Sequence, residues 1–289
     1  SDTGNLMESM APNQTGTASE LGLIAELQVA LKATPPSVLA DWGKRTGERF
    51  LRVGAKRVTG IVDLATALTK RSADELVGLI EAGRDGRLPV HLEQRLDTGR
   101  RAAEAIVGQG KAVFDLVATK AATNPSEAAT HLCSLVIGFY TGSGGNGDGG
   151  IPDLDLLAGI GAHRSIFTHS IIAGAFVETA VLSLIDLVGE VHGRLPTRHS
   201  VFWDTLLRHS QIGGSTFVSG ASIGISTHLG IDTLVDGFTP YKDLPISLPQ
   251  GAHELLMGMN AVAEGVYGVR RYSGDFNAFL NGLTLRTSD

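Results

Sequence analysis

The sequence predicts an all-α fold, a multi-helix bundle, on the basis of three observations. Apolar residues recur at helical spacing along most of the 289 residues. Helix boundaries are marked by the adjacent Pro35 and Pro36, by Asn124 followed by Pro125, and by a glycine-rich run at residues 142–150. Alternating β-branched segments joined by hairpin turns are scarce. With 43% hydrophobic residues, the chain can fill a sizeable core.

The first part of the chain is predicted to hold a tail and a helical region. Residues 1–19 are polar and are interpreted as a disordered tail without the apolar core of a signal peptide. Residues 20–123 are expected to form an N-terminal helical region of unknown role, in which Ser72 and Glu75 match a capping box. The helices expected here span residues 21–32, 37–58, 76–82 and 92–119, and residues 61–68 continue or restart the second of them.

Residues 124–289 form the second predicted region, which carries the candidate chemistry between its helices. The glycine-rich run at 142–150 is expected to be a flexible loop, because glycine disfavours regular structure. It does not match a phosphate-binding P-loop, since no strand is expected before it and no Lys-Ser/Thr pair ends it. The helices expected here span residues 127–140, 169–189, 201–209, 215–235, 251–267 and 275–283.

Composition and charge narrow the function classes. A formal net charge of −6 argues against nucleic-acid binding, although residues 41–120 hold an excess of basic side chains that we assign to solvated helical faces. The single cysteine, Cys133, excludes an intrachain disulfide. Residues 171–188 come closest to a membrane span, but Glu178 and Asp186 interrupt them. We expect a cytoplasmic protein with buried helices; association with the inner membrane and homo-oligomerisation are both compatible with the sequence.

The most informative stretch, residues 151–170, combines two carboxylates with two histidines. Asp153 and Asp155 are followed at short range by His163 and His169 in an otherwise apolar region. Ionised groups are costly to bury alone, and carboxylate and imidazole donors together are the ligands of divalent metals such as Zn²⁺. In an extended segment both carboxylates would point the same way. A turn or an N-cap before the following helix is the alternative.

The two histidines of this stretch can converge only if the helix breaks between them, since six residues apart on one helix they lie on different faces. Ser165 or Thr168 is the expected N-cap of the helix that follows. The free N–H groups of that N-terminus favour an anionic substrate group. Arg164 adds a bidentate contact to phosphate or carboxylate, or else forms an ion pair with one of the aspartates.

Further candidates come from neighbouring helices. His228 and Asp232 have i, i+4 spacing, which puts both side chains on one helix face among apolar residues. His131 lies in an apolar helix and is interpreted as a further metal ligand, with a buried core histidine as the alternative. The remaining histidines lack such surroundings and are predicted to be surface or hydrogen-bonding residues: His192, His199, His209 and His253. For His253, with Glu254, a position near the site is the alternative.

These blocks resemble the YdjM-like family of predicted metal-dependent hydrolases. The matching blocks are Thr130 to Leu132, Pro152 to Asp155, His163 to Ser170 and Thr227 to Pro240. The family shows Asp-x-Asp-His in the second block, where this chain has Leu156 at the last position, and Ser165 replaces its usual glycine. The family also looks distantly similar to the all-helical zinc-dependent phospholipase C fold. The resemblance implies seven metal-binding residues: His131, Asp153, Asp155, His163, His169, His228 and Asp232.

The same resemblance implies a metal-dependent hydrolase with one or two divalent ions, Zn²⁺ being favoured by the histidines. Asp153 or Asp155, with Asp155 preferred, is the expected general base if it is not a ligand. Arg164 and Ser170 are expected to steady a phosphoryl or carboxyl oxygen of a small-molecule or lipid phosphoester. A usual catalytic zinc has three protein ligands, and seven candidates exceed that number. Either two metals bind, or some of the seven residues do not touch the metal and instead orient its ligands or act as the general base. The alternative is a non-catalytic helical interaction or regulatory protein with a structural or degenerate metal site.

Overall fold

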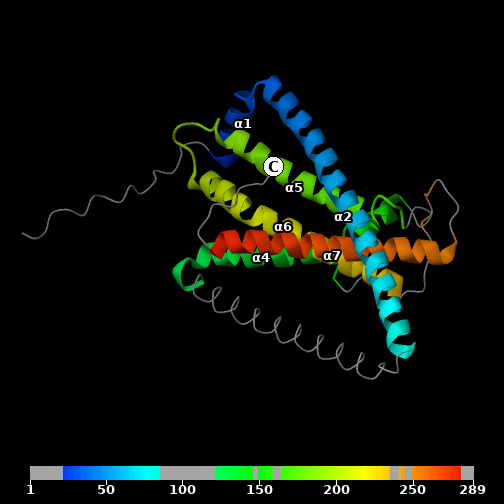
Figure 1. Cartoon of the computed structure of the whole chain (residues 1–289). Helices are drawn as coiled ribbons and strands as arrows, with labels where there is room; N and C mark the ends of the chain where they lie inside the picture. The colour runs from blue at the N-terminus through cyan, green and yellow to red at the C-terminus, as the bar shows by residue number, and fades with distance from the viewer. Residues whose placement is uncertain are drawn as a thin grey trace, which may run out of the picture.

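The computed structural model is built from helices that pack against one another, which confirms the all-α prediction (Figure 1). The described part of the chain comprises residues 22–84, 121–145, 149–158, 164–234, 241, 243–244 and 249–280. Its elements are α1 (Leu23–Lys32), α2 (Pro36–Arg84), α4 (Pro125–Ser143), the 3₁₀-helix η1 (Pro152–Ala158), α5 (Ile171–His192), α6 (Val201–Leu234) and α7 (Gln250–Leu280). The predicted tail at 1–19 and the predicted helix at 92–119 lie outside these ranges.

Helix α6 is the centre of the bundle. It packs against α4 on one side, against α7 on another, and against α5, whereas α2 crosses over α5 and α7 (Figure 1). The buried apolar cluster is built mainly from α5, α6 and α7, around Ile225, Leu229 and Met257. Because Leu229 follows His228 directly in α6, this core borders the predicted chemistry.

Three helix breaks that the sequence predicts are absent. Helix α2 is continuous through Ser72, so the predicted capping box is wrong: an N-cap needs non-helical backbone, which Ser72 does not have. Helices α6 and α7 each join two predicted helices. In α6 the apparent break at Gly213 and Gly214 is a packing feature. A Cβ atom at these glycines would lie 2.2 Å from the side chain of Ser134 and 2.1 Å from that of Ile185, respectively.

Reciprocal glycines bring α4 and α6 into backbone contact. A Cβ atom at Gly142 of α4 would lie 2.2 Å from the carbonyl oxygen of Ala221. One at Gly220 of α6 would lie 2.1 Å from the carbonyl oxygen of Leu135. Gly138 and Gly224 repeat the pattern one turn along each helix. Only glycine allows this approach, which fixes the end of α4 against the part of α6 that carries His228.

Basic residues of α2 face acidic residues of α5 along the line where these helices meet. Arg45 pairs with Glu190 at 3.2 Å, and Arg49 pairs with Asp186 at 2.8 Å. The two sets of numbers run in opposite directions, so the helices are antiparallel here. The prediction that this basic segment forms only solvated faces is therefore wrong for its first part, which packs on the bundle.

The innermost of these contacts is a buried charge network around Arg57. Its guanidinium pairs with Glu178 of α5 at 2.9 Å, with Glu264 of α7, and stacks over Tyr267 at 4.0 Å. Burial alone would lower the pKa of Arg57, but Glu264 and Glu178 outweigh it and raise that pKa. Gly174 leaves the space for this contact, since a Cβ atom there would lie 2.3 Å from the Arg57 guanidinium.

Helix α5 is the described helix whose length and composition would allow it to cross a membrane. In the fold, 50% of its most apolar stretch is buried inside the bundle. Its Glu178 is 3% exposed and also pairs with Arg271 of α7 at 2.6 Å. Half of the apolar stretch of α5 therefore packs in the protein interior.

Candidate metal centre

Side chains from three separate segments converge between η1, the start of α5 and the second half of α6. Asp153, His169 and His228 each place a ligand atom within 4.8 Å of the other two. The Asp153 Oδ1 atom lies 3.9 Å from Nε2 of His169 and 3.7 Å from Nε2 of His228. Ligands at 2.0–2.1 Å around a tetrahedral zinc are roughly 3.3 Å apart, so the spacing suits one ion. These residues could hold a metal.

Asp232 lies next to the two histidines of the same cluster. It lies one helical turn after His228 on α6, as its i, i+4 spacing predicts. Its Oδ2 atom lies 3.5 Å from Nε2 of His169 and 3.7 Å from Nε2 of His228. Asp232 therefore borders the cluster through the two histidines, whereas the ligand atoms that all lie within 4.8 Å of one another belong to Asp153, His169 and His228.

Asp155 lies behind His169 rather than beside the other ligand atoms. Its Oδ2 atom is 3.2 Å from Nδ1 of His169, on the far side of the ring from Nε2. The same oxygen accepts hydrogen bonds from the Thr168 hydroxyl at 2.8 Å and the Ser165 amide at 2.9 Å. Asp155 therefore orients the imidazole and keeps Nε2 directed at the cluster, as carboxylates behind metal-bound histidines do.

His228 is oriented in the same way by a backbone carbonyl. Its Nδ1 lies 3.4 Å from the carbonyl oxygen of Ser143, the last residue of α4. Its Nε2 is buried and has no hydrogen-bond partner in the described part of the chain. A neutral ring that donates through Nδ1 presents the Nε2 lone pair, which is the form that binds a metal. The glycine contacts between α4 and α6 bring this carbonyl to the site.

The two aspartates diverge because their segment is a 3₁₀-helix and not extended. With about three residues per turn, side chains two positions apart point in different directions. Asp153 faces the two Nε2 atoms and accepts from the amide of Gly149, whereas Asp155 faces Nδ1 of His169. The prediction that both carboxylates share one side of an extended segment is wrong, because this segment is helical.

Arg164 forms the ion pair that was the alternative prediction for it. Its Nη2 lies 3.5 Å from Oδ1 of Asp232, and it is 5% exposed. Its Nε and Nη1 atoms are buried and have no hydrogen-bond partner among the described residues. Its backbone has φ 67°, a left-handed conformation that is uncommon outside glycine and that clusters at functional sites. Donors for an anionic group thus lie next to the cluster.

Ser170 is a structural cap, which corrects two predictions. Its hydroxyl oxygen accepts from the Ile172 amide at 3.1 Å and donates to the Ile166 carbonyl, so it is the N-cap of α5 in place of Ser165 or Thr168. Because its proton and a lone pair are both engaged in the cap, the geometry does not support the predicted catalytic role. The predicted helix break before α5 is confirmed.

His131 is not brought to the cluster. It lies twelve residues before Ser143 on α4, a separation of about 18 Å along the helix. Its Nδ1 meets the Thr216 hydroxyl at 2.9 Å, and its ring lies 5.7 Å from that of Tyr272. Burial lowers the pKa of His131 to about 4. The alternative of a buried core histidine is correct; His163 lies outside the described residues.

Several residues that support the site were not found from the sequence. Asp243 holds the turn before α5 by accepting from the Ser165 hydroxyl and from the Ile166 amide at 2.8 Å. The Tyr241 hydroxyl donates to the carbonyl of His169 at 2.6 Å. Neither residue has a spacing that relates it to the histidines. Thr168, by contrast, stands next to His169 in the sequence, and this adjacency was the only sequence feature that pointed to a supporting residue.

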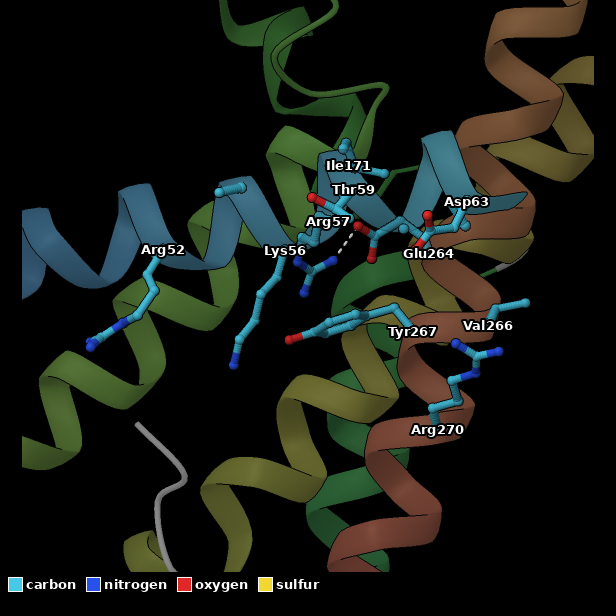
Figure 2. Close-up of a pocket in the computed structure, with 13 residues that line it drawn as sticks. Arg52, Lys56, Arg57, Thr59, Asp63, Ile171, Glu264, Val266, Tyr267 and Arg270 are labelled. Carbon is cyan, nitrogen blue, oxygen red and sulfur yellow. Dashed lines mark hydrogen bonds and ion pairs between the residues drawn. The ribbon is translucent and has the colours of Figure 1, made fainter. Parts of the chain in front are cut away.

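A cavity of about 790 Å³ lies between α2 and α7 (Figure 2). It reaches Ile171, two residues after His169. Figure 2 shows Arg57 and Glu264 meeting in its wall, with Tyr267 beneath them. Its lining holds four basic side chains and two acidic ones: Arg52, Lys56, Arg57, Arg270, Asp63 and Glu264. The cavity is therefore net positive and lies beside the N-terminal end of α5.

Comparison with protein-family models, with curated proteins and with solved structures gave no match to this chain.

Proposed function

We propose that the protein is a metal-dependent hydrolase in which Asp153, His169 and His228 hold a Zn²⁺ ion. The observation that carries the proposal is the convergence of two Nε2 atoms and a carboxylate, with each imidazole held through Nδ1 by Asp155 or the Ser143 carbonyl. Two nitrogens and one oxygen are the ligand set of many catalytic zinc sites, which leave one position for water or substrate. The resemblance to YdjM-like hydrolases supports the same function.

The residues around the cluster have distinct roles in this proposal. A bound Zn²⁺ supplies Lewis acidity and lowers the pKa of a water molecule near it. Asp232 accepts the proton of the attacking water, because its carboxylate lies within 3.7 Å of both Nε2 atoms. Arg164 holds Asp232 in place and offers its Nε and Nη1 donors to an anionic oxygen of the substrate. Asp155, the general base expected from the sequence, instead orients His169.

A phosphoester is the proposed substrate class. The Arg164 donors suit a phosphoryl oxygen, and the cavity beside α5 offers basic side chains for further negative charge. Apolar lining residues such as Ala55 and Val266 would accommodate hydrocarbon, which includes lipid phosphoesters in the class.

The experiment is hydrolysis of a generic phosphodiester, bis(p-nitrophenyl) phosphate, by zinc-loaded protein. His228→Ala is expected to lose the zinc ion of this centre and to lose turnover. Arg164→Asn, whose new residue tolerates positive φ, is expected to keep zinc and to lose at least about tenfold in turnover, as removal of a transition-state donor does. Zinc-loaded wild-type protein without turnover on phosphodiester, phosphomonoester and phospholipid substrates would refute the proposal.

A structural metal site in a non-catalytic helical protein is the second candidate, and Asp232 is the observation that favours it. With Asp232 as a fourth ligand the tetrahedral set is complete and no position is left for water. In that case zinc removal lowers thermal stability, no phosphoester is cleaved, and Asp232→Asn weakens zinc binding. In the hydrolase, by contrast, Asp232→Asn retains zinc and loses turnover.

A further inference from the structure

A second group of metal-type donors lies at the turn between α5 and α6. His192 ends α5, His199 precedes α6, and Asp204 lies in the first turn of α6. Their ligand atoms all lie within 4.8 Å of one another. Nε2 of His192 and Nε2 of His199 lie 2.8 and 3.1 Å from the same Oδ1 atom of Asp204. The sequence predicted only surface or hydrogen-bonding roles for both histidines.

His199 cannot satisfy its two polar contacts as a neutral imidazole. Its Nδ1 lies 2.9 Å from the carbonyl oxygen of Pro196, which only accepts, so Nδ1 must carry the proton. Its Nε2 then presents a lone pair to the Asp204 carboxylate at 3.1 Å. Two acceptors at this distance require a positive charge between them, supplied by a metal ion or by a second proton on the ring.

A neighbouring buried carboxylate adds to the negative charge at this turn. Glu26 of α1 is fully buried and accepts from the Ser200 amide at 3.0 Å and from Nε1 of Trp203 at 2.8 Å. Glu26 therefore places a second carboxylate at this turn, in addition to Asp204. The side chains of His192 and His199 are 23% and 20% exposed, so an ion can reach them from solvent.

We propose that His192, His199 and Asp204 form a second divalent metal site, which fixes the α5–α6 turn next to α1. Two imidazole nitrogens and one carboxylate suit Zn²⁺ and related first-row ions, with water completing the coordination. The site does not depend on the proposed hydrolase function, because it shares no residue with the first cluster.

Equilibrium dialysis of the full chain against Zn²⁺, followed by metal analysis, tests this site. Asp204→Asn and His199→Gln are each expected to bind one zinc ion fewer per chain than the wild type. His209→Gln is the matched control, since His209 also lies on α6 but contacts Thr130 instead, and it should bind as much zinc as the wild type. If the first site bound no zinc, the number of zinc ions per chain would be lower by the same amount in the wild type and in all three variants. The difference between the wild type and a variant therefore reports the second site alone.

Thermal unfolding gives the independent measurement. Asp204 is exposed and nearly isosteric with Asn, so the variant should show the wild-type circular dichroism spectrum without zinc. Zinc should raise the midpoint of unfolding less in Asp204→Asn than in the wild type, because a ligand of the native state stabilises it. Equal zinc counts and equal midpoint shifts in the variants and the wild type would overturn the proposal and leave a proton as the charge between His199 and Asp204.

Discussion

At the scale of single residues, the orientation of two imidazoles determines what the candidate centre can bind. His169 and His228 are each held through Nδ1, one by a carboxylate and one by a backbone carbonyl. This arrangement leaves both Nε2 atoms facing Asp153 and Asp232. The candidate ligand atoms are therefore positioned by groups on the far side of each ring, which would not contact a metal bound at Nε2.

Asp155→Asn tests this positioning role. The amide cannot supply the negative charge behind His169, so the zinc affinity of this centre should fall by about 10–100-fold while the centre still fills at saturation. Competition with a zinc chelator measures the affinity, and Asp41→Asn on the exposed face of α2 is the control. If Asp155→Asn abolished binding altogether, Asp155 would be a ligand; an unchanged affinity would remove it from the site.

His131 gives a pH dependence of stability. Burial lowers its pKa in the folded state to about 4, below its ordinary value of 6.5, so the neutral form stabilises the fold. That contribution is complete above pH 6.5 and is lost as the pH falls through about 4, because the unfolded chain gains the proton first. The total is on the order of 3 kcal/mol.

Urea unfolding of wild type and His131→Gln in the presence of a chelator measures this effect. The difference in unfolding free energy between the two proteins should shrink by about 3 kcal/mol from pH 7 to pH 4. Other titrating groups cancel in that difference. A difference independent of pH would contradict the assignment of His131 as a buried neutral histidine.

The sequence identified most residues of the candidate site but not what each side chain contacts. The i, i+4 pair on α6 and the break before His169 could be predicted, because helix geometry relates residues that are close in sequence. The distance of His131 from the site could not, since it depends on the register between α4 and α6. The separate roles of Asp153 and Asp155 depend on a 3₁₀ turn, and the Asp243 and Tyr241 contacts depend on tertiary packing.

At the scale of elements, close packing of α4 on α6 links the fold to the site. The glycines at their interface let the Ser143 carbonyl reach His228. The same type of packing explains why glycines in α6 do not end the helix. From the sequence alone, a glycine inside a helical pattern indicates a possible end of the helix. Whether the helix ends there depends on how it packs against its partner helix, which the sequence does not show.

Gly142→Ala tests the packing of α4 on α6. Its Cβ atom would lie 2.2 Å from a backbone oxygen that cannot move aside independently, so the unfolding free energy should fall by about 2 kcal/mol or more. Zinc affinity should fall with it, because the Ser143 carbonyl shifts. Gly47→Ala on α2, where a Cβ meets nothing within 4 Å, should instead gain about 0.5–1 kcal/mol. Equal effects of the two substitutions would argue against the close contact.

At the scale of the whole molecule, the Arg57 network joins α2, α5 and α7 into one body. Arg57 is 3% exposed, Glu178 is 3% exposed and Glu264 is fully buried. Burial raises the pKa of Glu264, whereas that of Glu178 stays low because Arg271 and Arg57 outweigh its burial. The N-terminal helix α2 is thus tied to the helices that carry the candidate centre, although the sequence showed no chemistry in it.

Arg57→Met should destabilise the protein by about 3–5 kcal/mol, because it leaves buried carboxylates without their main partner. Arg45→Met, which removes a half-exposed pair with Glu190 on the same two helices, should cost less than about 1 kcal/mol. Chemical denaturation of both variants gives the comparison. Similar small losses would show that the buried pair contributes no more than a surface one.

Anomalous diffraction at the zinc absorption edge tests whether Asp153, His169 and His228 bind a metal ion. Crystals of zinc-loaded protein should show an anomalous peak about 2.0–2.1 Å from Nε2 of both histidines, in contact with the Asp153 carboxylate. A structure of zinc-loaded protein with no anomalous peak between these side chains would contradict metal binding by these residues.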